Sequence, residues 1–312
     1  KRTYDWVVTR IEQGDKTDKN YGLCVDLGST TVIMRLVDLN TGDIVVEEGC
    51  FNKQISFGED ILNRIFYTRN SKEKLYEIHK ATIDTFSELI DIITEKSKIN
   101  SEDISVMTVA GNTTMIHFLL NIDPWTIFQM PYTPIFNHTG FISCDEIGIP
   151  INGYLYCFPS VANYLGGDIV SGVLFTEIYK QKELSAFIDI GTNGELVIGN
   201  EEFLVAVAGA AGPALEGGIS KFGMRAKEGA IDTIKIVDNN IKYTTIENKK
   251  PLGICGSGIV DLLSEMFLNG WIDFSGELKE NASKNIIKVN SQLAVEYATK
   301  EESENHESLI FT

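Results

Sequence analysis

The sequence feature that most restricts the fold is a short pattern that occurs twice. The first copy runs from Asp26 to Thr31 (DLGSTT) and the second from Asp189 to Gly194 (DIGTNG). Each copy lies between two strand-like runs rich in β-branched residues, and a third such run follows in both places. A duplicated three-strand unit predicts two similar domains in one chain rather than a single large sheet.

Periodicity extends this interpretation over the rest of the chain. The first repeat predicts strands over 21–28, 30–39 and 44–51, and the second predicts strands over 186–191, 194–199 and 201–209. Apolar residues at helical spacing predict a long helix over about 72–97. Strands at 104–109 and 154–158, each followed by a helix, complete a βββαβαβα order. We therefore expect an α/β fold with a mixed sheet covered by helices on both faces.

Composition shifts suggest where the domains begin and end. Residues 1–20 read as a short strand and a linker from a domain that precedes this chain, 21–180 as the first domain and 181–312 as the second. A hairpin is expected around Asn239 and Asn240, and a helix after the GICGSG segment. The sequence stops as it becomes apolar again, so we expect the second domain to be truncated at its C-terminus.

Charge and cysteine content narrow the function classes. The formal net charge is −17 and the pI is near 4.7, which opposes binding to nucleic acid or to an anionic membrane. The five cysteines contain no C-x-x-C pair, and the apolar runs around Cys24 and Cys157 favour buried free thiols. Free thiols make the reducing cytoplasm the default expected location. The sequence also contains no apolar run of about 18 residues.

The two repeated turns carry the predicted chemistry. One such turn alone is usually just a hairpin, but two copies in register can surround a phosphate chain. Glycine lets backbone N–H groups approach phosphate oxygens, hydroxyl and amide side chains add donors, and an aspartate at a strand end can hold waters of Mg²⁺. The candidates are Asp26 and Asp189 for the metal and for catalysis, and Gly28, Ser29, Thr30, Thr31, Gly191, Thr192, Asn193 and Gly194 for the phosphates.

On these turns the sequence resembles the actin-like ATPase (ASKHA) superfamily, which contains acetate and sugar kinases, heat-shock chaperones and actin. The resemblance implies duplicated ribonuclease H-like domains, a βββαβα core in each half, and ATP with Mg²⁺ in a cleft between them. The AGPALEGG segment resembles the double-glycine turn of the chaperones and adds Gly212, Gly217 and Gly218. Gly256 and Ser257 lie where an adenosine contact is expected, although a helix cap by Ser257 explains the same residues.

A closer resemblance is to the ATP-dependent reductive activators of corrinoid proteins. It rests on segments in family order, among them VDLGSTT, NKQISFGEDILNRI, GNTTMIHFLLNIDP, FPSVANYLGGDIVSG, IDIGTNGELVIG and GICGSGIVDLL. The resemblance implies a corrinoid methyl-carrier protein as partner and return of its cobalt(II) to cobalt(I). It also implies a [2Fe-2S] cluster in an N-terminal domain that this chain lacks. Association of two copies stays open.

Several polar residues have both a functional and a structural interpretation. Asp168, near the start of a predicted helix, either positions the attacking water or simply complements the helix dipole. Asn112 either caps a helix or faces the γ-phosphate, with capping favoured. Glu59, Asp60 and Arg64 either line the nucleotide cleft or form an ordinary helix start.

Three functions fit these observations. The first is an ATPase whose cycle drives reduction of a corrinoid protein. The second is a small-molecule kinase of the same fold, acting on a sugar or a carboxylate. The third is a non-enzymatic scaffold in which nucleotide acts as a conformational switch. A kinase needs a dedicated acidic base beside an acceptor pocket, and Asp168 is the candidate that the sequence offers.

Overall fold

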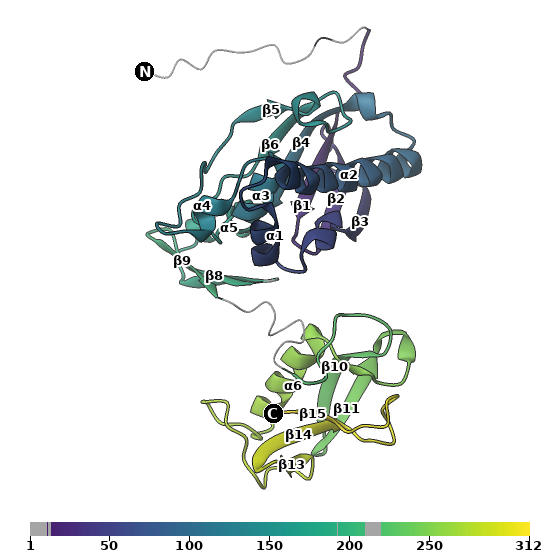
Figure 1. Cartoon of the computed structure of the whole chain (residues 1–312), viewed down its shortest axis with the longest axis vertical. Coiled ribbons are helices and arrows are strands. Elements are labelled where there is room, and N and C mark those ends of the chain that lie inside the picture. Colours follow the sequence, from purple (N-terminus) through teal and green to yellow (C-terminus); the bar gives the residue numbers. More distant parts are fainter. Residues whose placement is uncertain (1–10, 12–13, 192, 210–219) are drawn as a thin grey trace. The chain divides into compact units, whose positions relative to one another are not determined.

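The chain forms two compact units in the computed structural model, which describes residues 11, 14–191, 193–209 and 220–312. The first unit contains the described residues up to Asp189 together with Glu195–Ala208, and the second contains the others. Figure 1 shows the helices and strands of each unit. No helix in these ranges is both long and apolar enough to cross a membrane.

A six-stranded mixed sheet, in the order β3-β2-β1-β4-β6-β5, organises the first unit. Strands β1, β4 and β6 are parallel, whereas β2, β3 and β5 pair antiparallel with their neighbours. The strands are β1 (Tyr21–Leu27), β2 (Thr31–Asp38), β3 (Ile44–Phe51), β4 (Ile104–Gly111), β5 (Phe141–Ser143) and β6 (Tyr154–Cys157). The predicted meander is confirmed, and the short edge strand β5 is an addition that the sequence did not reveal.

Five α-helices accompany this sheet in the described part of the unit. They are α1 (Ile61–Thr68), α2 (Lys72–Ser97), α3 (Thr113–Leu119), α4 (Trp125–Phe128) and α5 (Gly167–Thr176). A helix was expected soon after Pro159, but α5 starts only at Gly167. The backbone explains the later start, because residues 161–164 form bends and Gly166 is the N-cap in an extended conformation.

The long helix α2 spans the range that its periodicity predicts. Ser71 caps its start by accepting a hydrogen bond from the Lys74 N–H group, and Lys98 ends it in a left-handed conformation. Its apolar stripe is buried, and Phe86 and Leu89 within it are fully buried. Figure 1 shows α2 lying across the sheet, where it contacts β2 and β3. The main core of the first unit therefore lies between α2 and one face of the sheet.

The alternation of side chains along β1 separates the two faces of the sheet. Leu23, Val25 and Leu27 are buried in the core with α2, whereas Cys24 and Asp26 point to the opposite face. Helix α5 contacts this second face at β4. Coverage of both faces is therefore only partly right, and Cys24 is exposed rather than buried as expected. By contrast, the buried thiol expected at Cys157 is confirmed.

The second repeat begins with a three-stranded sheet in the order β7-β8-β9. Its strands are β7 (Ser185–Ile190), β8 (Gly194–Gly199) and β9 (Leu204–Gly209), close to the predicted ranges. A small apolar cluster that includes Ile169 of α5 and Val197 of β8 joins this sheet to α5. The start of the second repeat thus packs on the last helix of the first.

The second unit has its own apolar core around Trp271 and helix α6 (Gly256–Leu268). Its strands are β10 (Ala230–Val237), β11 (Asn240–Thr245), β12 (Gly253–Ile254), β13 (Ile286–Val289), β14 (Gln292–Ala298) and β15 (Leu309–Phe311). The predicted hairpin joins β10 to β11, with Asp238 and Asn239 at positive φ. Asn239 also accepts a hydrogen bond from the Trp271 indole at 2.8 Å, which ties the hairpin to the core.

Truncation of one α2 core side chain tests this arrangement. We expect Leu89→Ala to lower the free energy of unfolding by about 2–5 kcal/mol, because it removes fully buried methyl groups and leaves a cavity. The exposed Glu95→Ala on the same helix is the control and should change it by less than about 0.5 kcal/mol. Urea unfolding followed by circular dichroism measures both, and equal midpoints would contradict the packing of α2.

Candidate functional site

Three aspartates that the sequence singled out line one cavity of the first unit. Asp26 comes from the end of β1, Asp168 from the first turn of α5 and Asp189 from the end of β7. The cavity has a volume of about 580 Å³. Because these residues lie far apart in the sequence, the site exists only where α5 packs between the two repeated meanders.

Proximity and burial change the protonation of these carboxyl groups. The side chain of Asp26 is open to solvent in the cavity, yet the surrounding protein raises its pKa, the charge of Asp189 raises it further and Arg35 opposes the rise. Burial likewise raises the pKa of Asp189. Carboxylates gathered in this way favour a bound cation, because it relieves their mutual repulsion.

Asp168 is perturbed more strongly than its neighbours. Burial raises its pKa to about 7, although a hydrogen bond from the Ile169 N–H group, at 2.8 Å, opposes the change. The charges of Glu195, Asp189 and Asp26 raise it further. A carboxyl group with such a pKa can accept and release a proton near neutral pH. Asp168 thus lies both in the first turn of a helix and on the cavity, so its two interpretations are compatible.

The turn after β1 is too tight for a side chain at its first residue. A Cβ atom on Gly28 would lie 2.5 Å from the backbone oxygen of Thr31. Ser29 is buried, and Thr31 is exposed at the start of β2. The turn also makes two hydrogen bonds to Asn52, which is fully buried. These two bonds hold the backbone of the turn on the side that faces Asn52.

The turn after β7 resembles the first in sequence but is looser around its glycine. Gly191 has open space where a side chain would be, and its N–H group donates to the Asn193 carbonyl at 2.8 Å. Gly194 begins β8. Thr192, Gly212, Gly217 and Gly218, which were also predicted to contact phosphate, lie outside the described residues.

Other predicted site residues have structural partners. Asn112 caps α3 by accepting from the Met115 N–H group at 3.0 Å, so the capping interpretation is confirmed. Ser257 does not cap α6, because the N-cap is Cys255 and the Ser257 hydroxyl donates to the Asp232 carbonyl at 2.8 Å. Gly256 and Ser257 begin α6 in the second unit.

The structure around α1 decides between the two interpretations given for Asp60 and Arg64. Arg64 does not line the cavity, since its side chain is fully buried and hydrogen-bonded to Gln54 and to the Gly58 carbonyl. Burial lowers the pKa of Arg64 to about 10. Asp60 caps α1 through the Asn63 N–H group. The helix-start interpretation is therefore right for Asp60, and Arg64 belongs to the core.

Sequence reasoning missed two residues at the site. Arg35, on β2, lines the cavity and pairs with Glu47. It lies directly opposite Cys24 in the strand pairing, so strand alternation alone could have placed it on the same face as Asp26. Glu195 is buried at the start of β8, and no sequence pattern indicated that its charge acts on Asp168.

The residues present fit a magnesium nucleotide better than a directly bound metal. The described chain contains no group of three or more His, Cys, Asp or Glu side chains placed to hold a metal ion. Two carboxylates beside glycine turns suit Mg²⁺, which usually keeps several waters and is held partly by phosphates. Burial raises the pKa of both Cys144 and Cys157 to about 12, so these thiols are protonated at neutral pH.

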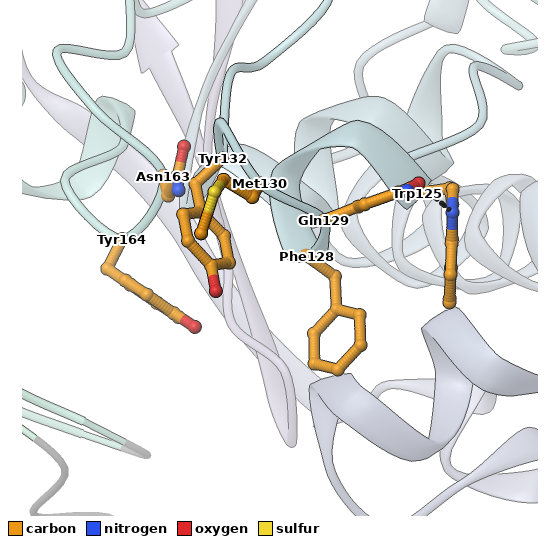
Figure 2. A pocket seen from close by; sticks show the side chains of 7 residues that line it. All are labelled: Trp125, Phe128, Gln129, Met130, Tyr132, Asn163 and Tyr164. Atoms are coloured by element: carbon orange, nitrogen blue, oxygen red, sulfur yellow. Dashed lines mark hydrogen bonds between the residues drawn. The ribbon is translucent and has the colours of Figure 1, made fainter.

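A second cavity has a different character. It has a volume of about 760 Å³ and lies beside α4, and Figure 2 shows the aromatic rings of Trp125, Phe128, Tyr132 and Tyr164 around it. Its polar groups are neutral, and one of them, the amide of Gln129, accepts a hydrogen bond from the Trp125 indole at 2.7 Å. Without charged groups or a glycine turn among its lining residues, this cavity is poorly suited to a triphosphate.

Family comparison agrees with the order of these elements. The model of the RACo middle region matches residues 21–181, and that of the C-terminal domain of RACo, the ASKHA domain, matches residues 183–312. The chain belongs to the RACo family. The ASKHA match confirms the predicted fold class, a duplicated ribonuclease H-like fold of the actin-like ATPase type.

Individual relatives support the same family. The chain is 31% identical to the corrinoid activation enzyme RamQ of Eubacterium limosum, over 98% of this chain and 53% of the relative. It is 24% identical to a [Co(II) methylated amine-specific corrinoid protein] reductase of Methanosarcina barkeri, over 69% and 41%. A solved reductive activator for corrinoid, iron-sulfur protein is 40% identical, with a TM-score of 0.75 over 97% and 49%. The chain thus spans about half the length of these relatives, or less.

The raised pKa of Asp168 predicts a distinct pH dependence of stability. The folded protein holds this proton up to about pH 7, whereas an ordinary Asp loses it near 3.8, so the contribution of Asp168 to wild-type stability falls as the pH rises between these values. The Asp168→Asn variant has no carboxyl group to deprotonate at this position, so it does not lose stability in this way. We expect the variant to gain on the order of 2–4 kcal/mol over wild type from pH 4 to 8. Urea unfolding across this range measures the gain.

The exposed carboxylate of Asp43 provides the control for this measurement. The difference between Asp43→Asn and wild type should stay nearly constant over the same pH range. If the difference for Asp168→Asn were equally flat, the carboxyl of Asp168 would not be desolvated as the structure indicates.

Proposed function

We propose that this chain is the ATP-binding and ATP-hydrolysing part of a reductive activator, which returns a corrinoid protein from cobalt(II) to cobalt(I). The observation that carries the proposal is the meeting of Asp26, Asp168 and Asp189 in one cavity, beside a glycine turn, in a chain of the RACo family. A clustered set of carboxylates with raised pKa values is typical of an active site.

Each residue type has a defined role in this proposal. Asp26 and Asp189 would hold Mg²⁺ through its waters, and the ion would neutralise the phosphate charge that these acids alone repel. The backbone of the Gly28 turn would supply N–H donors to the phosphates. Asp168 would orient the attacking water and accept its proton, which suits a carboxyl with a pKa of about 7.

The names of the relatives motivate the corrinoid partner. They include a corrinoid activation enzyme, a reductase of a cobalt(II) corrinoid protein and a reductive activator of a corrinoid, iron-sulfur protein. The cobalt centre is the substrate and gains one electron, which an external low-potential reductant must supply. ATP hydrolysis would provide the free energy for this uphill transfer through a change of conformation.

The direct test measures ATP hydrolysis by the protein with and without a cobalt(II) corrinoid protein and a reductant, while absorbance follows cobalt(I). We expect the hydrolysis rate to rise with the partner, and cobalt(I) to form only when ATP is present. No turnover of ATP under any condition would refute the proposal. Transfer of the γ-phosphate to an added sugar or carboxylate would favour a kinase instead.

Removal of one predicted metal-side carboxylate tests the site itself. We expect Asp26→Asn to lower kcat/KM for ATP about 10- to 100-fold, because groups that hold a metal through its waters have effects of this size. Part of the loss should be recovered at higher Mg²⁺ concentration. The exposed Asp43→Asn should leave the rate unchanged, and an Asp26→Asn enzyme with wild-type Mg²⁺ dependence would remove Asp26 from the metal site.

A further inference from the structure

Asn52 lies directly behind the glycine turn that follows β1. Its backbone N–H group donates to the Thr30 carbonyl at 2.8 Å, and its side-chain Nδ2 donates to the Gly28 carbonyl at 2.9 Å. The residue is fully buried. One asparagine therefore holds the two carbonyl groups on either side of Ser29.

Asn52 is itself fixed by a buried polar network. Its Oδ1 accepts from the Gln54 N–H group at 3.0 Å and so caps the short 3₁₀ turn of Lys53–Phe57. Gln54 in turn donates to Thr82 of α2 at 2.6 Å and accepts from Arg64 of α1 at 3.1 Å. These partners connect Asn52, through Gln54, to two helices of the core.

The two hydrogen bonds determine which way the turn's peptide groups face. In a trans peptide the C=O of one residue and the N–H of the next point in opposite directions. Because the Gly28 and Thr30 carbonyls point toward Asn52, the N–H groups of Ser29 and Thr31 point away from it. Asn52 thus sets the direction of backbone N–H dipoles in the turn assigned to phosphate.

The strand pairing of the hairpin does not require this contact. The β1–β2 ladder closes at Leu27 and Val32, and the β2–β3 ladder ends at Thr31 and Phe51, where the backbone bond from Asn52 to Thr30 continues it. The bond from the Asn52 side chain to Gly28 lies beyond both ladders. An apolar residue could fill the buried space at position 52 and would avoid the desolvation of an amide. The oxygen of this amide caps the 3₁₀ turn, whereas its Nδ2 donor serves the turn after β1 by holding the Gly28 carbonyl.

We propose that Asn52 is a positioning residue for nucleotide binding, which pre-organises the Gly28–Thr31 turn to receive the phosphates of ATP. The inference rests on the proposed function, since it assumes that this turn binds phosphate. Pre-organised backbone donors bind an anion without paying to reorient at the moment of contact. Asn52 thus acts through the turn and needs no contact with ATP.

The test compares Asn52→Ser with Thr82→Val in this 312-residue chain. Ser keeps an oxygen that can cap the 3₁₀ turn but is too short to reach the Gly28 carbonyl, and it adds no charge. Thr82→Val removes a hydrogen bond from the same buried network without touching the turn. Calorimetry and competition binding give the Kd values for Mg–ATP and for adenosine, and urea unfolding gives the stability of each variant.

We expect Asn52→Ser to weaken Mg–ATP binding about tenfold or more, as for loss of one buried hydrogen bond, while adenosine binding stays within about twofold. Thr82→Val should keep the wild-type ratio of the two affinities, even where its stability is lower. Equal losses for ATP and adenosine in Asn52→Ser, or no loss for either, would overturn the inference.

A second variant covers the case in which Asn52→Ser fails to fold. Asn52→Thr fills more of the buried space and also lacks a donor long enough to reach Gly28, so the same loss specific to ATP is expected.

Failure of the proposed function is distinct from failure of this inference. A wild-type chain that bound no ATP would overturn the function, whereas a binding chain with unaffected Asn52 variants would overturn only the role of Asn52.

Discussion

The arrangement of the first unit depends on the desolvation of carboxyl groups around Asp168. Withdrawal of acids from water and their gathering in one cavity cost free energy, which appears as the raised pKa values of Asp26, Asp168 and Asp189. Other parts of the fold must supply the stability that offsets this cost. A bound cation would lower the cost. The site is thus destabilised when empty and suited to a charged ligand.

The sheet separates stability from chemistry by the alternation of side chains along its strands. On one face of β1, Leu23, Val25 and Leu27 pack under α2 in the main core. On the other face, Cys24 and Asp26 lie with α5 along the cavity that contains the three aspartates. A shift of one residue in the pairing would exchange these faces and would bury the aspartate in the apolar core. The register that forms the core therefore also forms the site.

The same principle connects the loop after β3 to the site. Buried polar residues are rare in a core unless they are hydrogen-bonded, and here Asn52 is bonded to Gln54 and Gln54 to Arg64, while Asn52 and Arg64 also donate to backbone carbonyl groups. Among the described residues, only Nη2 of Arg64 in this network has no partner. This network lies between the apolar core under α2 and the turn after β1. Its hydrogen bonds connect the turn to the core and restrain it. Without them, the glycine would allow the turn many backbone conformations.

The sequence by itself determined the elements and the chemistry of the two turns. Local periodicity and the repeated D-x-G pattern predicted the meanders, α2 and the aspartates, because strand and helix periods and glycine turns are properties of neighbouring residues. Only the tertiary structure placed Asp168 beside Asp26, made Arg64 a core residue and showed that Asn52 holds the turn. Which side chains meet across distant segments, and how far water is excluded from them, depends on packing that no short window of sequence contains.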